Sequence, residues 1–407
     1  MKKYNSIQKW KLGNEMNIHG TEKETIELFV KIYGRNPEVF SRAPGRLEIL
    51  GNHTDYNDGL VLSAAVNQST EIALSPVKGR ICRLFSSLQG GGEPVSFSLD
   101  EIGTAKKGDW TNYIKGVICE IRKRGKDIGA FDAVVTSTVP LSAGMSSSAA
   151  LEVSACFAFN KAFGIEFCSA DWARIGQGSE NNYIGIKSGL LDQFSSIFGK
   201  EHSLIYCDFR TVEVIRNVKV PAGYVFVVAN SMVKHDLVDS DYNLRRESCE
   251  RAVAAIRKKH PQIKALRDVS LKLLETEKKL MDKTDYLRAL HVVGENTRVI
   301  AGVKALEDGK IGDFGKLLFE SHESSVRNFE NSCPELDYLV ELAKSIPGCI
   351  GSRLSGGGFG GISIHLVEEK EAERYCDRIK SAFKLRTGKD TQTIICGIGE
   401  GAEAKKL

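Results

Sequence analysis

The sequence predicts a mixed α/β fold with two domains. The chain has 407 residues, which is too long for one ordinary hydrophobic core. Segments whose apolar residues recur at helical spacing alternate along it with short β-branched runs that are typical of strands. No low-complexity linker separates the halves, and the change of pattern near 205–215 places the domains at 1–210 and 211–407.

The N-terminal half mixes helices and strands. Apolar residues at helical spacing predict a helix over 22–33. The apolar, β-branched run FDAVVTSTV predicts a strand over 131–139, and the apolar stripe after a small-residue loop predicts a helix over 149–163. Two further short strands are expected at 204–207 and 212–215.

The C-terminal half continues the alternation, with more helix. The expected elements are, in order, a strand over 223–229, a polar loop over 230–242, a charged helix through Arg257, amphipathic helices between 271 and 345, a glycine loop and strand over 352–367, a helix over 371–383 and a strand over 391–398.

The composition is that of an ordinary globular protein, with 42% hydrophobic residues, 27% charged residues and a net charge of +4. The basic residues are scattered, so solvated helix faces explain them better than a nucleic-acid surface. No stretch approaches the roughly 18 apolar residues of a membrane-spanning helix, and residues 1–17 lack the apolar run of a signal peptide. The ten cysteines form no CxxC pair and predict reduced, packed thiols. We expect a cytoplasmic protein without nucleic-acid or membrane partners.

Residues 43–60, APGRLEILGNHTDYNDGL, are dense in polar side chains set among glycines. Glycines allow the backbone to turn sharply or to approach a ligand closely. Polar groups packed this densely are poor core material. The segment is therefore expected to form the wall of a ligand site rather than plain scaffold.

Residues 140–150, PLSAGMSSSAA, connect the predicted strand and helix of the N-terminal half. A helix N-terminus presents unpaired N–H groups and a positive dipole, which suits it to bind phosphate. The chain contains no GxxxxGK[ST] sequence, so this is not a Walker P-loop. The alternative is that Ser146 simply caps the helix.

Residues 180–193, ENNYIGIKSGLLDQ, place two carboxylates, Glu180 and Asp192, on either side of two glycines. Phosphoryl transfer needs a cation held by oxygen ligands and a group that orients or deprotonates the attacking hydroxyl. The pair is suited to both tasks. The alternative is that both are solvated surface residues.

Residues 354–362, LSGGGFGGI, satisfy the G-x-G-x-x-G pattern through Gly356, Gly358 and Gly361. The strand-like ISIHLV that follows argues against a dinucleotide fold, which needs a helix at this point. A close approach of the backbone to another loop or to a phosphate explains the glycines better. A glycine-rich structural turn is the alternative.

Taken together and in chain order, these segments resemble the motifs of the GHMP small-molecule kinase superfamily. Residues 45–56, GRLEILGNHTDY, resemble the galactokinase signature GRxNLIGEHTDY. Further segments that resemble galactokinase sequences are 110–118, 230–250, 288–296 and 321–337. The resemblance implies an N-terminal domain like the second domain of ribosomal protein S5, a ferredoxin-like C-terminal domain and an active site in the cleft between them.

The resemblance also implies an activity, the ATP-dependent phosphorylation of the C1 hydroxyl of galactose to give galactose 1-phosphate and ADP. Asp192, in the LLDQ that matches the family's MDQ, would be the catalytic base or an anion aligned on that hydroxyl. Arg46 would lie beside it and favour its ionised form, or stabilise charge in the transition state.

Further roles are carried over from the family in the same way. A sugar, ATP and Mg²⁺ are the expected ligands, and the protein is expected to be a monomer. The C-terminal loop 356–361 would pack against the phosphate loop. The implied sugar contacts are Asn52, His53, Asp55, Gly189 and Tyr242; the implied ATP contacts are Trp110, near the adenine, with Ser142, Ala143, Gly144, Met145, Ser146, Ser147, Ser148 and Ala149; the implied Mg²⁺ ligands are Ser147, Ser148 and Glu180.

The chain departs from the signature at two positions. The family's Glu is Asn52, and its earlier Asn is Glu48. In the family that Glu contacts the sugar hydroxyls near C6, so an amide there removes a negative charge and adds donors. A related sugar such as galacturonate or N-acetylgalactosamine is therefore an alternative substrate, and we expect Asn52→Glu to improve the use of galactose if Asn52 sets specificity.

A non-catalytic sugar sensor is an alternative from another functional class, because galactokinase-like proteins also serve as regulatory partners. Such sensors are expected to lose part of the serine-rich segment. Residues 147–150 are intact here, and Arg46 and Asp192 are both present, which favours an enzyme. Ser142 and Ala143 replace glycines that are common in the family's loop, a change that conserves size.

Overall fold

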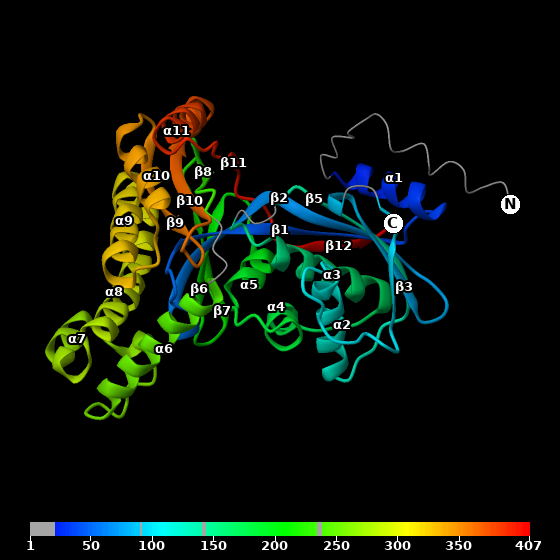
Figure 1. Ribbon diagram of the computed structural model, residues 1–407, viewed down its shortest axis with the longest axis horizontal. Coiled ribbons are helices and arrows are strands. Elements are labelled where there is room, and N and C mark those ends of the chain that lie inside the picture. The colour runs from blue at the N-terminus through cyan, green and yellow to red at the C-terminus, as the bar shows by residue number, and fades with distance from the viewer. Residues whose placement is uncertain (1–20, 90–91, 141–143, 234–237) are drawn as a thin grey trace.

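Two β-sheets organise the chain in a computed structural model that describes residues 21–89, 92–140, 144–233 and 238–407 (Figure 1). The strands are β1 (Val39–Leu50), β2 (Leu60–Pro76), β3 (Ile81–Ser86), β4 (Val95–Ser98), β5 (Phe131–Ser137), β6 (Ser203–Asp208), β7 (Glu213–Lys219), β8 (Tyr224–Asn230), β9 (Cys349–Ser355), β10 (Ile362–Glu368), β11 (Thr393–Cys396) and β12 (Glu403–Lys406). The larger sheet follows the path β12-β1-β2-β5-β3-β4, with β6 beside β2 and β7 beside β6. The smaller sheet has the order β11-β8-β10-β9.

Helices cover both faces of the larger sheet and also pack on both faces of the smaller sheet (Figure 1). None of those in the described ranges is both long and apolar enough to cross a membrane. The helices are α1 (Glu22–Tyr33), α2 (Asn112–Lys123), α3 (Ser147–Phe163), α4 (Ser169–Gly178), α5 (Leu191–Phe198), α6 (Val238–Arg257), α7 (Leu271–Glu277), α8 (Lys283–Glu307), α9 (Ile311–Ser324), α10 (Pro334–Ser345) and α11 (Ala372–Thr387).

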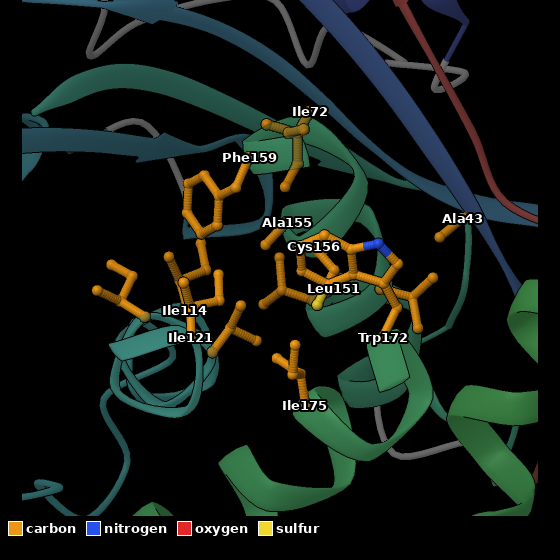
Figure 2. Close-up of a cluster of buried hydrophobic side chains, with 14 of the residues drawn as sticks. Ala43, Ile72, Ile114, Ile121, Leu151, Ala155, Cys156, Phe159, Trp172 and Ile175 are labelled. Atoms are coloured by element: carbon orange, nitrogen blue, oxygen red, sulfur yellow. The ribbon is translucent and has the colours of Figure 1, made fainter. Parts of the chain in front are cut away.

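The larger sheet carries apolar side chains on both faces. Figure 2 shows Ile72 of β2 in the same cluster as Leu151 of α3 and Trp172 of α4. The next residue of β2, Ala73, packs instead with Phe29 of α1. Successive side chains of a strand point to opposite faces, so α1 and the α2–α5 layer enclose the sheet between them.

The smaller sheet is ferredoxin-like. Its elements follow a β-α-β-β-α-β order, with α6 to α10 between β8 and β9 and α11 between β10 and β11. All neighbouring strands are antiparallel, and the spatial order is fourth, first, third, second. The ferredoxin-like C-terminal domain expected from the resemblance is confirmed.

The two sheets share a hydrophobic core. Phe226 of β8 and Ile364 of β10 belong to the same buried cluster as Leu47 and Ile49 of β1. The opposite face of β8, represented by Val227, packs against α10 and α11. Because β1 is packed from both sheets, residues at its C-terminal end lie at a fixed junction between the two halves of the molecule.

Most of the predicted elements are present, with boundaries that shift by a few residues. α1 spans the predicted 22–33, β5 ends at Ser137, and α3 begins two residues before the expected 149. The largest difference concerns the polar loop predicted over 230–242. Within its described part α6 begins at Val238, so Tyr242 lies on a helix.

The first part of residues 43–60 is scaffold as well as cavity wall, so the expectation for this segment is wrong only in excluding a scaffold role. Up to Leu50 the segment belongs to β1, and Leu47 and Ile49 are fully buried between the sheets. Arg46 and Glu48 alternate with them and are buried as well. Charged groups can be buried in this way only when they are paired, and the strand is hard to predict because they interrupt its apolar pattern.

The chain continues beyond the strand expected at 391–398. β12 pairs antiparallel with β1, with Lys406 opposite Val39 and Glu403 opposite Arg42. β7 and β12 therefore belong to the larger sheet although both follow residue 210 in the sequence. The division of the chain at 210 stays a prediction.

Helix α9 and strand β9 approach so closely that only glycine fits between them. A Cβ atom on Gly315 would lie 2.1 Å from the carbonyl oxygen of Ile350. We expect Gly315→Ala to lower the free energy of unfolding by about 3 kcal/mol, because backbone atoms must shift. Gly312, in the same helix, has no atom within 4 Å of its hypothetical Cβ, so Gly312→Ala is the matched control and should be neutral or stabilising by up to about 1 kcal/mol. Urea unfolding measures both, and equal stability of the two variants would contradict this packing.

Candidate active site

Two cavities adjoin each other, one at the junction of the sheets and one beside the larger sheet. The first, of about 420 Å³, is lined by residues from β1, α5, α6 and the glycine loop, among them Arg46, Glu48, Asn52, His53, Asp55, Asp192, Tyr242, Gly356 and Gly357. The second, of about 730 Å³, is lined among others by Lys106, Lys107, Trp110, Val135, Ser147 and Leu151. Tyr113, Ser148 and Ile186 line both. Two ligands bound in these cavities would therefore meet at Ser148.

A bidentate ion pair lies in the wall of the first cavity. Arg46 Nε and Nη2 donate to Asp192 Oδ1 and Oδ2 at 2.7 and 2.8 Å. The Arg46 side chain is 8% exposed, whereas that of Asp192 is 28% exposed. The guanidinium therefore fixes the orientation of a carboxylate that remains accessible to a ligand.

The loop before α3 is bound to β1 by backbone contacts. Arg46 N donates to Met145 O at 3.1 Å, and Arg46 Nη1 donates to Gly144 O at 2.6 Å. This approach requires Gly45, because a Cβ atom there would lie 2.8 Å from Met145 O. Gly144 and Met145, at the end of the loop before α3, are thus held directly against the Arg46–Asp192 pair.

Ser146 does not cap α3 with its side chain, so the simple capping alternative is wrong. It is the N-cap residue with φ 53°, and no side-chain capping bond is present. Its hydroxyl donates instead to Asp192 Oδ2. A non-glycine residue with positive φ is uncommon and often marks a functional site.

Glu180 and Ser148 are suited to hold a divalent cation where the cavities meet. Glu180 lies on a π-helical turn, Ser179–Ile184, directly after α4, and is 6% exposed. Burial and the charge of Asp192 raise the pKa of Glu180, while hydrogen bonds from Ser188, Ser148 and Gln193 act in the opposite direction. Carboxylate and hydroxyl oxygens are ligands that Mg²⁺ prefers.

The described residues contain no group of three His, Cys, Asp or Glu side chains that could hold a metal on their own. Mg²⁺ commonly takes only one or two carboxylates and completes its shell with water and substrate phosphates. The oxygens of Ser148 and Glu180 fit this type of site.

His53 is a neutral, aromatic part of the cavity wall. Its Nδ1 lies 2.9 Å from Tyr56 Oη and its ring stacks on Phe329, with centroids 4.5 Å apart. The ring of Tyr242 also contacts it, with centroids 5.1 Å apart. Burial lowers the pKa of His53 to about 3, so it contacts a ligand as a neutral imidazole at physiological pH.

Asp55 and Gly189 are in direct contact. A Cβ atom on Gly189 would overlap Asp55 Oδ2, at 1.7 Å, so the segment leading to α5 can lie over Asp55 only with glycine at this position. Burial raises the pKa of Asp55 to about 6, and the charge of Asp192 acts in the same direction. The two aspartates therefore face the same cavity.

Asn52 is held entirely by protein groups. Its Nδ2 donates to Glu48 Oε1 and to Gly356 O, both at 2.8 Å, and its Oδ1 accepts from Asn331 Nδ2 at 3.1 Å. Its neighbour Glu48 is 4% exposed and lines the same cavity. Although position 52 is an amide, Glu48 therefore supplies a carboxylate close to it in the same cavity.

Glu48 should make the stability of the protein depend on pH. Burial raises its pKa to about 7, against the opposing charge of Arg353, whereas a glutamate in an unfolded chain has a pKa of about 4.3. Between these values the folded protein holds a proton that the unfolded chain releases, so the free energy of unfolding falls as pH rises. We expect Glu48→Gln to gain on the order of 3 kcal/mol relative to the parent between about pH 4 and pH 8. Urea unfolding across this range measures the difference, and a difference that is constant with pH would contradict the assignment.

The structure brings most of the predicted residues to the two cavities. The five predicted sugar contacts and the Arg46–Asp192 pair line the first cavity, and Trp110, Ser147 and Ser148 line the second. Gly144, Met145 and Ser146 contact Arg46 or Asp192 instead. Ala149 is 1% exposed and packed in α3, and Ser142 and Ala143 lie outside the described residues.

The sequence interpretation missed Glu48 as a group in the cavity, and it missed Asn331, Tyr113 and the lysine pair Lys106–Lys107. The lysines lie a few residues before the predicted Trp110, and two cations close to an aromatic residue are a usable signal for a nucleotide. Asn331 carries no such signal, because its place beside Asn52 follows only from the fold. The glycine loop reaches the end of the phosphate loop, as Gly356 lies near Gly144 O, but it also lines the first cavity.

Comparison with known proteins agrees with this geometry. The models "GHMP kinases N terminal domain" and "GHMP kinases C terminal" match residues 112–200 and 303–385. The fold is thus that of a GHMP kinase. The model "Galactokinase galactose-binding signature" matches residues 27–76.

The curated relatives define the family more narrowly. A galactokinase of Roseiflexus sp. is 37% identical over 93% of this chain and 96% of its own length, and one of Chloroflexus aggregans is 37% identical over 92% and 95%. The crystal structure of Lactococcus lactis galactokinase complexed with galactose superposes with a TM-score of 0.88 and 30% identity, covering 94% of this chain and 98% of that one. The chain therefore belongs to the galactokinase family, as the resemblance predicted. The mevalonate kinase of Methanococcus jannaschii shares only the fold, with 17% identity and a TM-score of 0.60.

Proposed function

We propose that this chain transfers the γ-phosphoryl group of ATP to the C1 hydroxyl of galactose, giving galactose 1-phosphate and ADP. The observation that carries the proposal is the Arg46–Asp192 pair, which lies in a polar cavity adjoining a second cavity with lysines and a tryptophan. Membership of the galactokinase family supports the same reaction.

Each residue then has a physical task. Asp192 orients the C1 hydroxyl. It either accepts the proton of that hydroxyl as a base, or acts only as an anion that aligns the hydroxyl while the proton passes to solvent. Arg46 fixes that carboxylate and stabilises charge as the phosphoryl group moves. His53, Asp55, Gly189 and Tyr242 form the wall around the sugar.

The second cavity would take the nucleotide. Trp110 offers an aromatic surface near the adenine, and Ser147 and Ser148 lie at the N-terminus of α3, where unpaired N–H groups face phosphate. Ser148 and Glu180 would hold Mg²⁺, with Ser147 as a further hydroxyl. The ion would neutralise charge on the phosphates. A monomeric state, a cytoplasmic location and the absence of nucleic-acid and membrane partners stay predictions.

A turnover assay tests the proposal against the sensor alternative. Purified protein with Mg-ATP is expected to release ADP when galactose is added, and to release little without sugar. The panel should also contain N-acetylgalactosamine and galacturonate, the alternative substrates. Binding of sugars without release of ADP would show a sensor, and a higher kcat/KM for one of the alternatives would change the substrate.

A further inference from the structure

Glu48 is a buried carboxylate in the first cavity to which the proposed reaction assigns no task. Its contacts with Asn52 Nδ2, at 2.8 Å, and with Arg353 Nη2, at 3.5 Å, both involve Oε1. Within the described ranges Oε2 has no hydrogen-bond partner in the protein. A carboxylate oxygen at the wall of a sugar-sized cavity is suited to accept a hydrogen bond from a ligand hydroxyl.

Glu48 lies away from the place where the reacting hydroxyl would bind. Arg46 and Glu48 are two residues apart on β1 and line the same cavity. Residues i and i+2 of a strand are separated by about 7 Å, which is comparable to the length of a hexose. A sugar whose reacting hydroxyl lies at Asp192 would therefore meet Glu48 with a different group, such as its exocyclic hydroxyl.

Asn52 cannot easily take this task itself. Both of its amide hydrogens are used, one by Glu48 and one by Gly356 O, and its oxygen accepts from Asn331. Its backbone N–H is also bound, by Glu295 Oε2 at 3.0 Å. Asn52 is thus a positioning residue that holds the Glu48 carboxylate in place.

We propose that Glu48, positioned by Asn52, selects the sugar at its exocyclic group: it accepts a hydrogen bond from a hydroxyl there and repels a carboxylate. This inference rests on the proposed function and narrows it: neutral hexoses are substrates and uronic acids are not. Positions 48 and 52 exchange the amide and the carboxylate of the signature, so the two departures act as one coupled change. The expectation that Asn52→Glu alone improves galactose use is therefore reversed, because that variant places two carboxylates in contact.

The test compares four variants. Glu48→Gln removes the charge and keeps the shape, Asn52→Glu adds a second carboxylate, and Glu48→Asn with Asn52→Glu exchanges the pair. Glu71→Gln is the matched control, because Glu71 is also 4% exposed and burial also raises its pKa to about 7, yet it contacts Thr25 outside both cavities. Each variant is assayed at about pH 8.5, where Glu48 and Glu71 are both ionised, with galactose, 6-deoxygalactose and galacturonate. Binding of the same sugars is measured by calorimetry at the same pH.

In the parent protein we expect kcat/KM for 6-deoxygalactose and for galacturonate to be at least about 100-fold below that for galactose. Glu48→Gln should raise the ratio of galacturonate to galactose at least about tenfold, while Glu71→Gln leaves this ratio unchanged. Asn52→Glu should lower kcat/KM for galactose about 100-fold, and the exchanged pair should recover at least about tenfold of that loss.

Three results would overturn the role of Glu48: equal use of galactose and galacturonate by the parent, the same sugar ranking in Glu48→Gln and Glu71→Gln, or undiminished galactose use by Asn52→Glu. Failure of the proposed function is a separate outcome, seen as no release of ADP by the parent with any sugar. The calorimetric ranking then still decides the role of Glu48, and absence of binding by every sugar would overturn both.

Discussion

Replacing Asp192 by Asn is expected to lower kcat about 1,000-fold while leaving the affinity for galactose within a few-fold of the parent. The amide has nearly the same shape and can still accept one hydrogen bond from Arg46, so the cavity keeps its form. The anion that orients the hydroxyl and receives its proton is lost. Release of ADP measures kcat, and calorimetric titration with galactose measures binding.

A second aspartate in the larger sheet provides the control. Asp132 of β5 is also bound in bidentate fashion by an arginine, Arg83, and lies outside both cavities. Asp132→Asn should lower stability but leave kcat of the folded protein within about two-fold, as expected for a residue away from the reacting atoms. Unreduced kcat in Asp192→Asn would exclude Asp192 from the reaction.

Substitutions of Arg46 should show that kcat depends on both the charge and the planar shape of its side chain. Arg46→Met leaves Asp192 without its partner and frees the carbonyl of Gly144, and we expect a loss of about 100-fold to 1,000-fold in kcat. Arg46→Lys restores a positive charge but not the planar fork that binds two carboxylate oxygens. It should recover only part of the loss.

Steady-state kinetics of the two Arg46 variants separate these effects. If Arg46 acts on the transition state, kcat falls while KM for galactose changes little. A rise in KM with unchanged kcat would instead make Arg46 a ground-state binding residue. Full activity in both variants would contradict the assigned role.

Local patterns predicted much of the fold because they depend on neighbouring residues. The apolar spacing of 22–33 and the β-branched run beginning at Phe131 correspond to α1 and β5. The strand β1 is not recognisable in this way, since Arg46 and Glu48 interrupt its apolar residues and are buried only because distant groups pair with them. Tyr242 is likewise predicted in a loop but lies on α6.

Some residues of the candidate site could be predicted from local motifs, and others could not. Arg46, Asp192 and the serines before α3 stand in recognisable motifs, so the resemblance could place them. The Glu48–Asn52–Asn331 network joins side chains up to 279 positions apart. Its existence depends on how the glycine loop and α8 fold against β1, through Gly356 O and Glu295, and no spacing in the chain reports that arrangement.

Phosphorus NMR of the product made from galactose and Mg-ATP tests the central claim most directly. The account predicts a sugar phosphate esterified at C1, formed in equal amount with ADP by the parent, and formed about 1,000-fold more slowly by Asp192→Asn. Phosphate at another hydroxyl, or ADP accompanied only by inorganic phosphate, would contradict the claim that Asp192 and Arg46 direct the phosphoryl group to the C1 hydroxyl.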